Sequence, residues 1–320
     1  MNRRFALIQA LVSLVALAAV VWWASRQESP HIPTDGGAIA WLLAAIGLYV
    51  LATLVRAERW HQILERTGVR TRRADCYALT TVGYMGNNVL PARAGEALRV
   101  VLLSSRCDAS KRTIISSIVA ERVLDVIVLL TIFVVTVYGV LSTSDVLPTD
   151  RPLLVTGIGV ALVIAGAVVI WVLRSHHVFE RARDWLRPLA DAPRALLNRN
   201  GALLLAGTVV LWLLEAAVYL AVARALDLDF SMSGVLYLVA LTNFVAALPA
   251  APGSIGTFDA AVAFGAKALG ATGSAALSYV ILLRFVLYVP ITVFGLVVLI
   301  TRYGGWSRLR SAARLEASRA

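Results

Sequence analysis

Charged residues are scarce in this sequence, because Asp, Glu, Lys and Arg together make up only 15% of its 320 residues. A soluble domain is about one quarter charged, so the scarcity excludes an ordinary soluble protein. Hydrophobic residues account for 59% of the chain, and the mean hydropathy is +0.78. They lie in long apolar runs, which are typical of membrane-spanning helices. We therefore expect an integral membrane protein.

Cysteine and histidine are also rare, with two and four copies respectively. Cys76 and Cys107 have no ligand-like spacing to each other or to a histidine, so we expect reduced thiols and neither a disulfide nor a metal site. The sequence has no nucleophile elbow, no Walker loop and no dinucleotide fingerprint. We accordingly predict no catalytic residue, no metal and no cofactor, and a protein that is not an enzyme.

Acidic residues are outnumbered by basic ones, 19 to 30, which leaves a net charge of +11. Such a balance in a soluble protein would indicate nucleic-acid binding. Here the arginines lie in short loops beside apolar runs, where they orient a membrane protein and attract anionic lipid headgroups. We expect membrane lipids with anionic headgroups as partners, and no nucleic acid.

The apolar runs predict about six full spans, at residues 5–24, 38–55, 113–141, 152–173, 202–223 and 275–300. The first run is longer than a signal-peptide core of about 7–15 residues, so we interpret it as an uncleaved anchor. Basic loops at 56–73 and 174–199 and the basic tail at 302–320 are expected in the cytoplasm. This predicts a multi-pass protein of the cell inner membrane with both termini cytoplasmic.

Two further segments, 76–106 and 233–273, enter the membrane by their composition but are interrupted by proline and glycine. The first break reads Leu90-Pro91-Ala92-Arg93-Ala94-Gly95, and the second reads Leu248-Pro249-Ala250-Ala251-Pro252-Gly253. The loop charges are consistent only if both segments are re-entrant hairpins, the first dipping from the cytoplasm and the second from outside. Two such elements of opposite orientation are typical of an inverted repeat.

The predicted fold class is therefore an all-α polytopic membrane protein with two re-entrant helical hairpins. One membrane domain would cover residues 1–320. Within it, residues 38–141 form the first pseudo-repeat, residues 202–301 form the second, and residues 302–320 form the tail.

Ionisable groups at membrane depth are costly and indicate function. Glu121 and Asp125 share one helix face beside Arg122, and this face is expected to line a polar cavity and to pair with Arg93 or Arg99. The alternative is an ion cluster at headgroup level. Metal binding by the two acids is disfavoured because no histidine accompanies them.

The first break itself carries Arg93, Glu96 and Arg99 at intervals of three, which would share one face of a half-helix. Arginine binds phosphate bidentately, and a helix N-terminus after Pro91 would add free N–H groups. We predict a receptor for an anionic headgroup here. A solvated loop is the alternative.

The second break contains Gly253-Ser254-Ile255-Gly256, which fits either an anion-cradling turn or a plain tight bend. Arg284 lies inside the last span and needs a counter-ion, for which Asp259, Glu215 or a ligand phosphate are the candidates. The full set of predicted substrate-binding residues is Asn88, Arg93, Glu96, Arg99, Glu121, Arg122, Asp125, Gly253, Ser254, Gly256, Asp259 and Arg284.

Three motifs resemble the lysylphosphatidylglycerol synthase transmembrane-region family, whose members are also called flippase-like domain proteins. They are Asn-x-x-Leu-Pro-x-Arg-x-Gly-Glu from Asn87, Glu-Arg-x-x-Asp from Glu121, and Pro-Gly-x-x-Gly from Pro252. The resemblance covers residues 38–300. It implies an inner-membrane lipid-handling domain, which some members fuse to a soluble aminoacyl-transferase domain. Only a short basic tail follows Arg302, so we expect no aminoacylating half and no synthase activity.

These observations lead us to expect a lipid translocase that moves a phosphate-bearing headgroup, on a phospholipid or a polyprenyl-phosphate conjugate, across the cytoplasmic membrane. The motion would be passive or ion-coupled, with Glu121 and Asp125 as the protonation candidates. Two alternatives stay open. One is a membrane enzyme acting on a lipid-linked glycan or headgroup, and the other is an accessory subunit for a lipid-synthesising partner enzyme.

Overall fold

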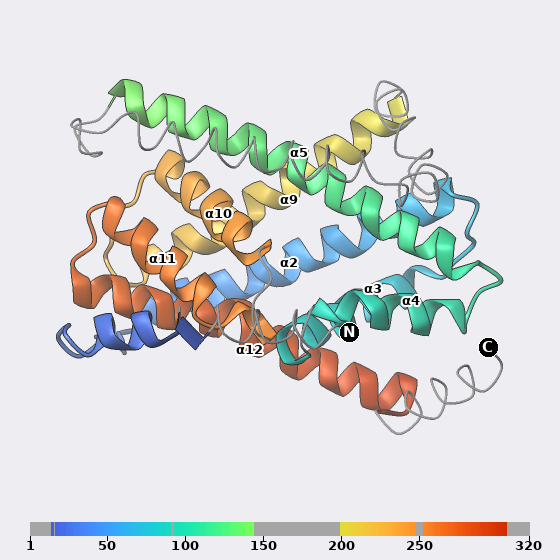
Figure 1. Cartoon of the computed structure of the whole chain (residues 1–320), viewed down its shortest axis with the longest axis horizontal. Helices are drawn as coiled ribbons and strands as arrows, with labels where there is room; N and C mark the ends of the chain where they lie inside the picture. The colour runs from blue at the N-terminus through green and yellow to red at the C-terminus, as the bar shows by residue number, and fades with distance from the viewer. Residues whose placement is uncertain (1–13, 16, 91–92, 144–198, 248–251, 306–320) are drawn as a thin grey trace.

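The computed structural model describes residues 14–15, 17–90, 93–143, 199–247 and 252–305, and every regular element in these ranges is helical (Figure 1). The elements are α2 (Gly36–Arg66), α3 (Arg73–Val89), α4 (Gly95–Ser104), α5 (Lys111–Thr143), α9 (Arg199–Arg224), α10 (Met232–Ala247), η2 (Pro252–Ser254), α11 (Thr257–Ala268) and α12 (Gly273–Tyr303). The predicted all-α class is confirmed. The predicted span at 152–173 and half of that at 5–24 lie outside the described residues, so the number of spans stays a prediction.

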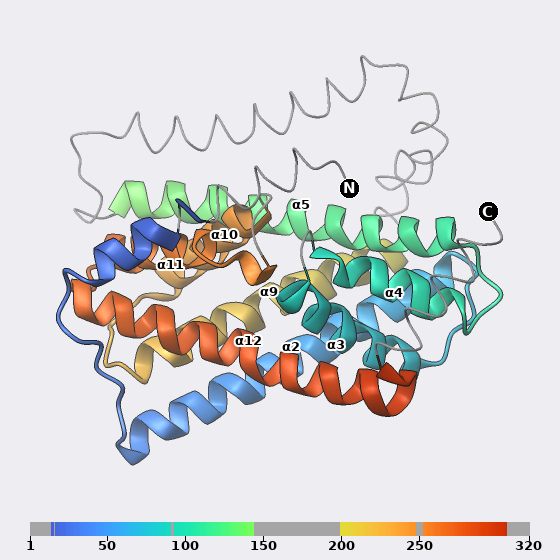
Figure 2. The ribbon, with the colours of Figure 1, turned by 60° about the horizontal axis from the view of Figure 1, so that its bottom comes forward.

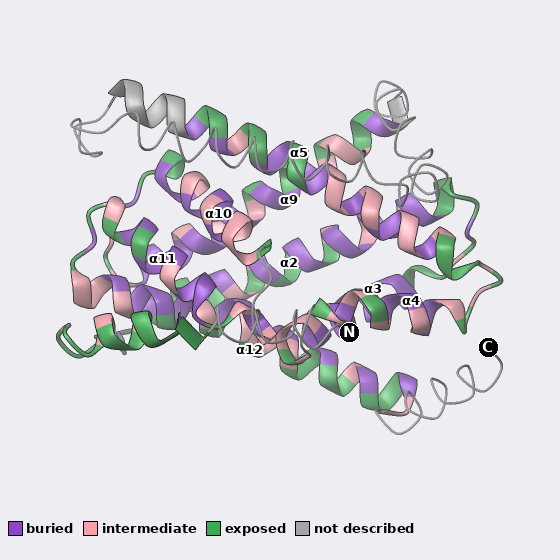
Figure 3. Cartoon of the chain, in the orientation of Figure 1, coloured by how far each residue is buried: buried purple, intermediate pink, exposed green. Residues whose placement is uncertain are grey.

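Three of the described helices are long and apolar enough to cross a membrane: α2, residues 201–224 of α9, and α12. At about 1.5 Å per residue, the 31 residues of α2 or of α12 exceed the ~30 Å hydrocarbon core of a bilayer. Large apolar side chains such as Leu43, Val293 and Phe294 are exposed on their outer faces. Figure 3 shows such exposed positions along the outer helices. We describe the chain as a multi-pass membrane protein.

Helix α2 is longer than the sequence predicted. It begins after Asp35, whose carboxylate accepts the N–H of Ala38 at 2.9 Å, and it continues to Arg66. The prediction of a basic loop from residue 56 was therefore wrong. The reason is that Arg56 and Arg59 lie on the buried face of the helix, where acidic partners from other helices compensate their charge.

Each predicted broken segment forms a helix, a break and a second helix, as expected. In the first pair, Gly95 at the start of α4 packs directly on α3, and a Cβ atom there would overlap the Gly83 carbonyl oxygen and the Asn87 nitrogen. In the second pair, Gly253 and Gly256 adopt φ values of 63° and 85°, which glycine reaches without steric cost. None of these four helices is longer than 17 residues, so none crosses a bilayer comfortably alone.

The two broken pairs lie at opposite ends of the long axis of the molecule, and both views show them there (Figures 1 and 2). Their breaks meet between them. A Cβ atom on Gly253 would lie 3.2 Å from the Asn88 carbonyl oxygen, and the guanidinium of Arg93 donates to the Ala246 carbonyl oxygen at 3.3 Å. The chain therefore follows the same order twice, a long helix, two short helices and a long helix, in α2–α5 and again in α9–α12.

Two apolar clusters hold these pairs in place. One is built mainly from α9 to α12 and includes Tyr219, Leu238 and Leu283. The other surrounds α3 and α4 and includes Trp60 and Leu79.

The two ends of the molecule differ in charge. The end where α2, α4 and α12 finish and α3 and α5 begin is basic (Figure 1). Its cations are Arg66, Arg70, Arg72, Arg73, Arg106, Lys111, Arg112 and Arg302. The opposite end carries Arg224 and Lys267 near its helix termini. We call the first of these ends the basic end.

Candidate functional site

The predicted site residues form two groups in the described structure. The first, which we call the central ion cluster, joins the predicted Glu96, Arg99, Glu121, Arg122 and Asp125 with three residues outside the predicted set, Arg56, Arg59 and Glu215. The second, the break junction, comprises Asn88, Arg93, Gly253, Ser254, Gly256, Asp259 and Arg284. The α5 face was expected to pair with Arg93 or Arg99, and the structure pairs Glu121 with Arg99.

Glu121 occupies the middle of the central ion cluster and is completely buried. Its carboxylate accepts a hydrogen bond from Arg99 at 2.9 Å. The second oxygen lies 3.4 Å from Arg59 and 3.7 Å from Arg122. Arg99 also stacks on the ring of Trp60, 3.9 Å from its centroid. One carboxylate from α5 thus holds arginines from α2 and α4 together, and a buried charge of this kind is tolerated because it is paired.

Asp125 lies one turn further along α5 and binds Arg59, the residue that connects the cluster to α9. It accepts from Arg59 at 2.7 Å and from Arg122 at 3.2 Å. Arg59 also donates to the hydroxyl of Thr208 at 2.9 Å. At the more exposed edge of the cluster, Arg122 reaches Glu96 in the first turn of α4, at 3.3 Å. The cluster therefore ties α2, α4, α5 and α9 to one another.

Arg56 and Glu215 form a buried pair at 2.9 Å, and Arg56 faces the rings of Tyr84 and Trp212 at 5.0 and 5.7 Å. Sequence reasoning missed both arginines of α2, because it treated them as loop residues, and it considered Glu215 only as a counter-ion for Arg284. One signal was available: apolar positions continue at helical spacing past Arg59 to Leu64, which indicates that the helix does not end at residue 55.

The central ion cluster is electrically balanced. Its cations are Arg56, Arg59, Arg99 and Arg122, and its anions are Glu96, Glu121, Asp125 and Glu215. Each arginine faces at least one carboxylate within 3.4 Å. An anionic ligand that binds here must therefore displace a carboxylate from its arginine.

Arg284 organises the break junction. Its Nε lies 2.6 Å from Asp259, and its Nη1 donates to the Gly253 carbonyl oxygen at 3.2 Å. The other oxygen of Asp259 accepts the N–H of Gly256 at 2.9 Å, which secures the start of α11. Of the three counter-ions considered for Arg284, Asp259 is the one present. The Nη2 of Arg284 is buried and has no hydrogen-bond partner among the described residues.

Arg93 does not share a helix face with Glu96 and Arg99, so that expectation was wrong. Helix α4 begins only at Gly95, because the glycine packs against α3, and Arg93 lies before it with φ of 52°. The side chain is exposed and reaches across to Ala246 at the end of α10. The expected helix N-terminus directly after Pro91 is likewise displaced to Ala94.

The other members of the junction hold its backbone in place. Asn88 donates to the hydroxyl of Thr292 in α12 at 2.9 Å. Ser254 has φ of 50°, and its carbonyl accepts from Thr257 at 3.2 Å. Asp259 is the only acid among the described residues of the junction, and it pairs with Arg284, while Arg93 contacts the Ala246 carbonyl oxygen. The junction therefore has one positive charge more than the acids there compensate.

A cavity of about 260 Å³ leads from the surface towards the central ion cluster. It is lined by Leu54, Val55, Glu58, Arg59, Gln62, Tyr77, Leu203, Leu204 and Gly207. Leucines from α2 and α9 form its apolar side, while Arg59 connects it to the cluster. No group of three or more His, Cys, Asp or Glu side chains arranged to hold a metal ion occurs within the described ranges.

Comparison with known proteins agrees with the motifs. The profile of the family described as "Lysylphosphatidylglycerol synthase TM region" matches residues 6–295. The glycosyltransferase AglD of Haloferax volcanii is 27% identical over 46% of this chain and 23% of its own length. A UPF0104 membrane protein of Pyrococcus horikoshii is 26% identical over 39% of this chain and 37% of its own length. Another UPF0104 membrane protein, from Methanocaldococcus jannaschii, is 30% identical over 30% of each chain.

The matched stretches therefore span well under half the length of each of these relatives. The family profile, in contrast, runs through both helix breaks and both arginine-bearing helices that follow them. The chain belongs to the lysylphosphatidylglycerol synthase transmembrane-region family.

Proposed function

We propose that this protein is a lipid translocase of the cytoplasmic membrane, which binds a phosphate-bearing lipid headgroup at the break junction. The observation that carries the proposal is the meeting of two helix breaks in mid-molecule, where Arg284 pairs with Asp259 and Arg93 contacts a backbone carbonyl with no acid beside it among the described residues. Non-helical backbone at membrane depth is tolerated where protein or a watery cavity satisfies it. Arginine forks there match the oxygens of a phosphate.

The proposed arrangement in the membrane follows from the ends of the molecule. With the basic end in the cytoplasm, α3 and α4 form a re-entrant hairpin from that side, and α10 and α11 form one from the outside. The two halves then constitute an inverted repeat. The repeated helix order and the opposite placement of the hairpins (Figure 2) support this interpretation.

Transport in this scheme alternates between the two halves. Arg284 and Arg93 hold the phosphate while the acyl or prenyl chains stay in the bilayer. When the protein opens towards one side of the membrane, α4 separates from α5 and the Glu96–Arg122 pair breaks. When it opens towards the other side, α11 separates from α12 and the Asp259–Arg284 pair breaks. If a proton drives the cycle, Glu121 and Asp125 are the carboxylates on which it acts.

Native mass spectrometry of the purified protein tests the headgroup site. The wild type is compared with Arg93→Ala and Arg284→Gln, and with Arg224→Ala as a control at the far end of α9. We expect the wild type and the control to retain one phospholipid or polyprenyl-phosphate class that both junction variants lose. Equal and unselective lipid in all four proteins would contradict the proposed site.

A second function is favoured by the relative that is named a glycosyltransferase, although that match covers 23% of its length. On this alternative the chain is a membrane enzyme, or an accessory subunit of a partner enzyme, in lipid-linked glycan or headgroup synthesis. Liposomes separate the two proposals. A translocase exposes the retained lipid to a membrane-impermeant quencher when reconstituted alone, whereas an accessory subunit does so only with its partner.

A further inference from the structure

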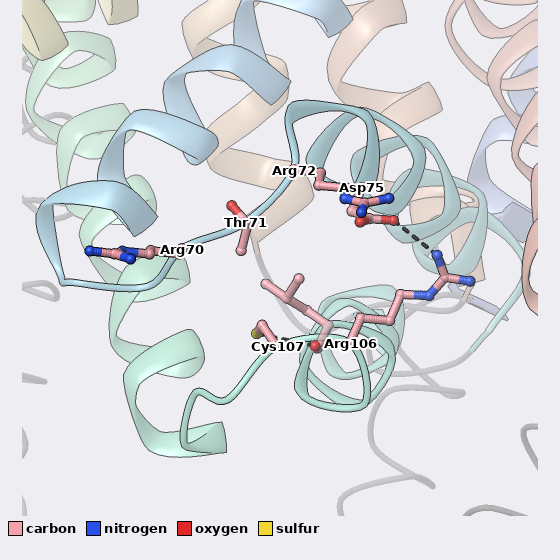
Figure 4. Close-up of a pocket in the computed structure, with 7 residues that line it drawn as sticks. Arg70, Thr71, Arg72, Asp75, Arg106 and Cys107 are labelled. Atoms are coloured by element: carbon pink, nitrogen blue, oxygen red, sulfur yellow. Dashed lines mark hydrogen bonds and ion pairs between the residues drawn. The ribbon is translucent and has the colours of Figure 1, made fainter.

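A second cavity lies at the basic end, away from the break junction. It has a volume of about 500 Å³, within the range of roughly 300–1,000 Å³ that small-molecule sites occupy. It is lined by Arg70, Thr71, Arg72, Asp75, Leu103, Arg106 and Cys107. Figure 4 shows the chain between α2 and α3, with Arg70 and Thr71, facing the turn after α4, with Arg106 and Cys107.

The charges around this cavity are unbalanced. Asp75 is the only acid that lines it, and its Oδ1 already accepts from Arg106 at 3.0 Å and from Arg302 at 2.9 Å. The side chains of Arg70 and Arg72 have no ion pair or hydrogen bond within the described part of the chain. The nearby Arg73 is different, since it pairs with Glu58 at 3.5 Å. The cavity therefore has an excess of positive charge even after the Asp75 pairs are counted.

The walls of the cavity are held in place. Arg106 donates to the Arg302 carbonyl oxygen at 2.9 Å and stacks on the ring of Tyr303 at 4.4 Å. Thr71 contacts His61 at 3.2 Å and Cys76 at 3.4 Å, which fixes the opposite wall. The two secured walls fix the backbone on both sides of the cavity, so that binding an anion requires ordering only the side chains of Arg70 and Arg72.

We propose that this cavity is a binding site for a phosphomonoester group, separate from the translocation site. Arg72 and Arg106 supply charge-assisted hydrogen bonds, and Arg70 reorients from the outward position in Figure 4 to close the site. The group is carried by an anionic lipid at the membrane surface or by a soluble phosphorylated molecule. Both sources present the same chemistry to the arginines.

Cys107 provides a reporter inside the cavity. It is half-buried, whereas Cys76 is fully buried, so a maleimide distinguishes the two thiols. Burial raises the pKa of the Cys107 thiol above its ordinary value, with Asp108 contributing, and labelling is therefore followed at mildly alkaline pH. Peptide mass spectrometry of the full, unmodified chain measures labelling at Cys107, with Cys76 as the internal reference.

The experiment compares glycerol 3-phosphate with sodium chloride of equal ionic strength, and phosphatidylcholine nanodiscs with and without phosphatidic acid. We expect saturable slowing of Cys107 labelling. Arg70→Gln combined with Arg72→Gln removes two exposed, unpaired arginines. It should raise the probe concentration needed for half-maximal protection of Cys107 at least tenfold, the effect of losing one charge-assisted hydrogen bond. The matched control, Arg224→Gln with Lys267→Gln, removes the same charge at the other end and should change nothing.

Protection by phosphatidic acid alone assigns the site to a lipid headgroup, and protection by glycerol 3-phosphate as well assigns it to soluble phosphomonoesters too. The proposal is overturned if neither probe slows labelling, if chloride protects equally, or if both double variants lose protection to the same extent. The last two results would mean that the arginines act only as a general positive field.

Discussion

Arg122 and Arg284 occupy matching places in the two halves of the molecule. Arg122 lies eleven positions after Lys111, the first residue of α5. Arg284 likewise lies eleven positions after Gly273, the first residue of α12. Each pairs with an acid in the first turn of the preceding half-helix, Arg122 with Glu96 at 3.3 Å and Arg284 with Asp259 at 2.6 Å.

This equivalence predicts matching transport defects. If the two pairs open alternately during one cycle, Arg122→Gln and Arg284→Gln should each slow headgroup translocation in liposomes at least tenfold, because each cycle then lacks one of its closed states. The rate is measured by the loss of fluorescence of a labelled lipid to an external quencher. Arg224→Gln should leave the rate unchanged. A defect in one variant only would show that the halves are not functionally equivalent.

Replacing Glu121 with Gln should destabilise the fold by roughly 3–5 kcal/mol, the cost of breaking a buried ion pair by removing one partner. Glu121 is completely buried, and its loss leaves Arg59, Arg99 and Arg122 facing one another around a neutral amide. Thermal unfolding in detergent measures the effect. Glu65→Gln removes the same charge from a side chain that is 57% exposed and should cost less than about 1 kcal/mol. Equal shifts in the two variants would contradict the structural role of the cluster.

Gly95→Ala should open the first hairpin. A Cβ atom at this position would overlap backbone atoms of Gly83 and Asn87, which cannot move aside as a flexible side chain can. We expect a destabilisation of about 2 kcal/mol or more, in the range of overpacked sites. Gly47→Ala is the matched control, because nothing lies within 4 Å of a Cβ atom at that position in α2, and alanine there should stabilise the helix slightly. The prediction is contradicted if Gly95→Ala and Gly47→Ala change the free energy of unfolding in the same direction.

The proposed re-entrant hairpins predict which turns face which side of the membrane. In a chain with Cys76 and Cys107 replaced by alanine, Ser105→Cys and Arg72→Cys flank the first hairpin, while Ser231→Cys and Gly270→Cys flank the second. A membrane-impermeant maleimide applied to intact cells should label only the second pair. Labelling at one end of a hairpin and not at the other would mean that the segment crosses the membrane.

The sequence predicted the helical breaks well because proline and glycine act locally. Residues 76–106 and 233–273 contain the two broken pairs with bounds a few positions from the observed ones. The pairing of Glu121 with Arg99 was one of two alternatives, the other being Arg93, and both candidates lie in the segment that precedes α5 in the chain. Arg284 with Asp259 was one of three alternatives, and the structure selects it.

The rest of the site depends on contacts that no local pattern encodes. Arg56 meets Glu215 from 159 positions away, and Arg59 meets Asp125 from 66. The usual preference of arginine for cytoplasmic loops outweighed the continuing helical periodicity at residues 56–64, so both side chains were assigned to a loop. Arg93 was misplaced for a different reason, because the close contact of Gly95 with α3 delays the start of α4.

The balanced charges of the central ion cluster have a consequence for the energetics of transport. Moving one net charge through the membrane potential changes the free energy by about 2.3 kcal/mol per 100 mV. A rearrangement that carries four arginines and their four carboxylates together moves no net charge. On the proposed translocase function, the membrane potential would therefore act on the cargo and on the uncompensated charge of the break junction, and not on this cluster as long as its eight side chains move together.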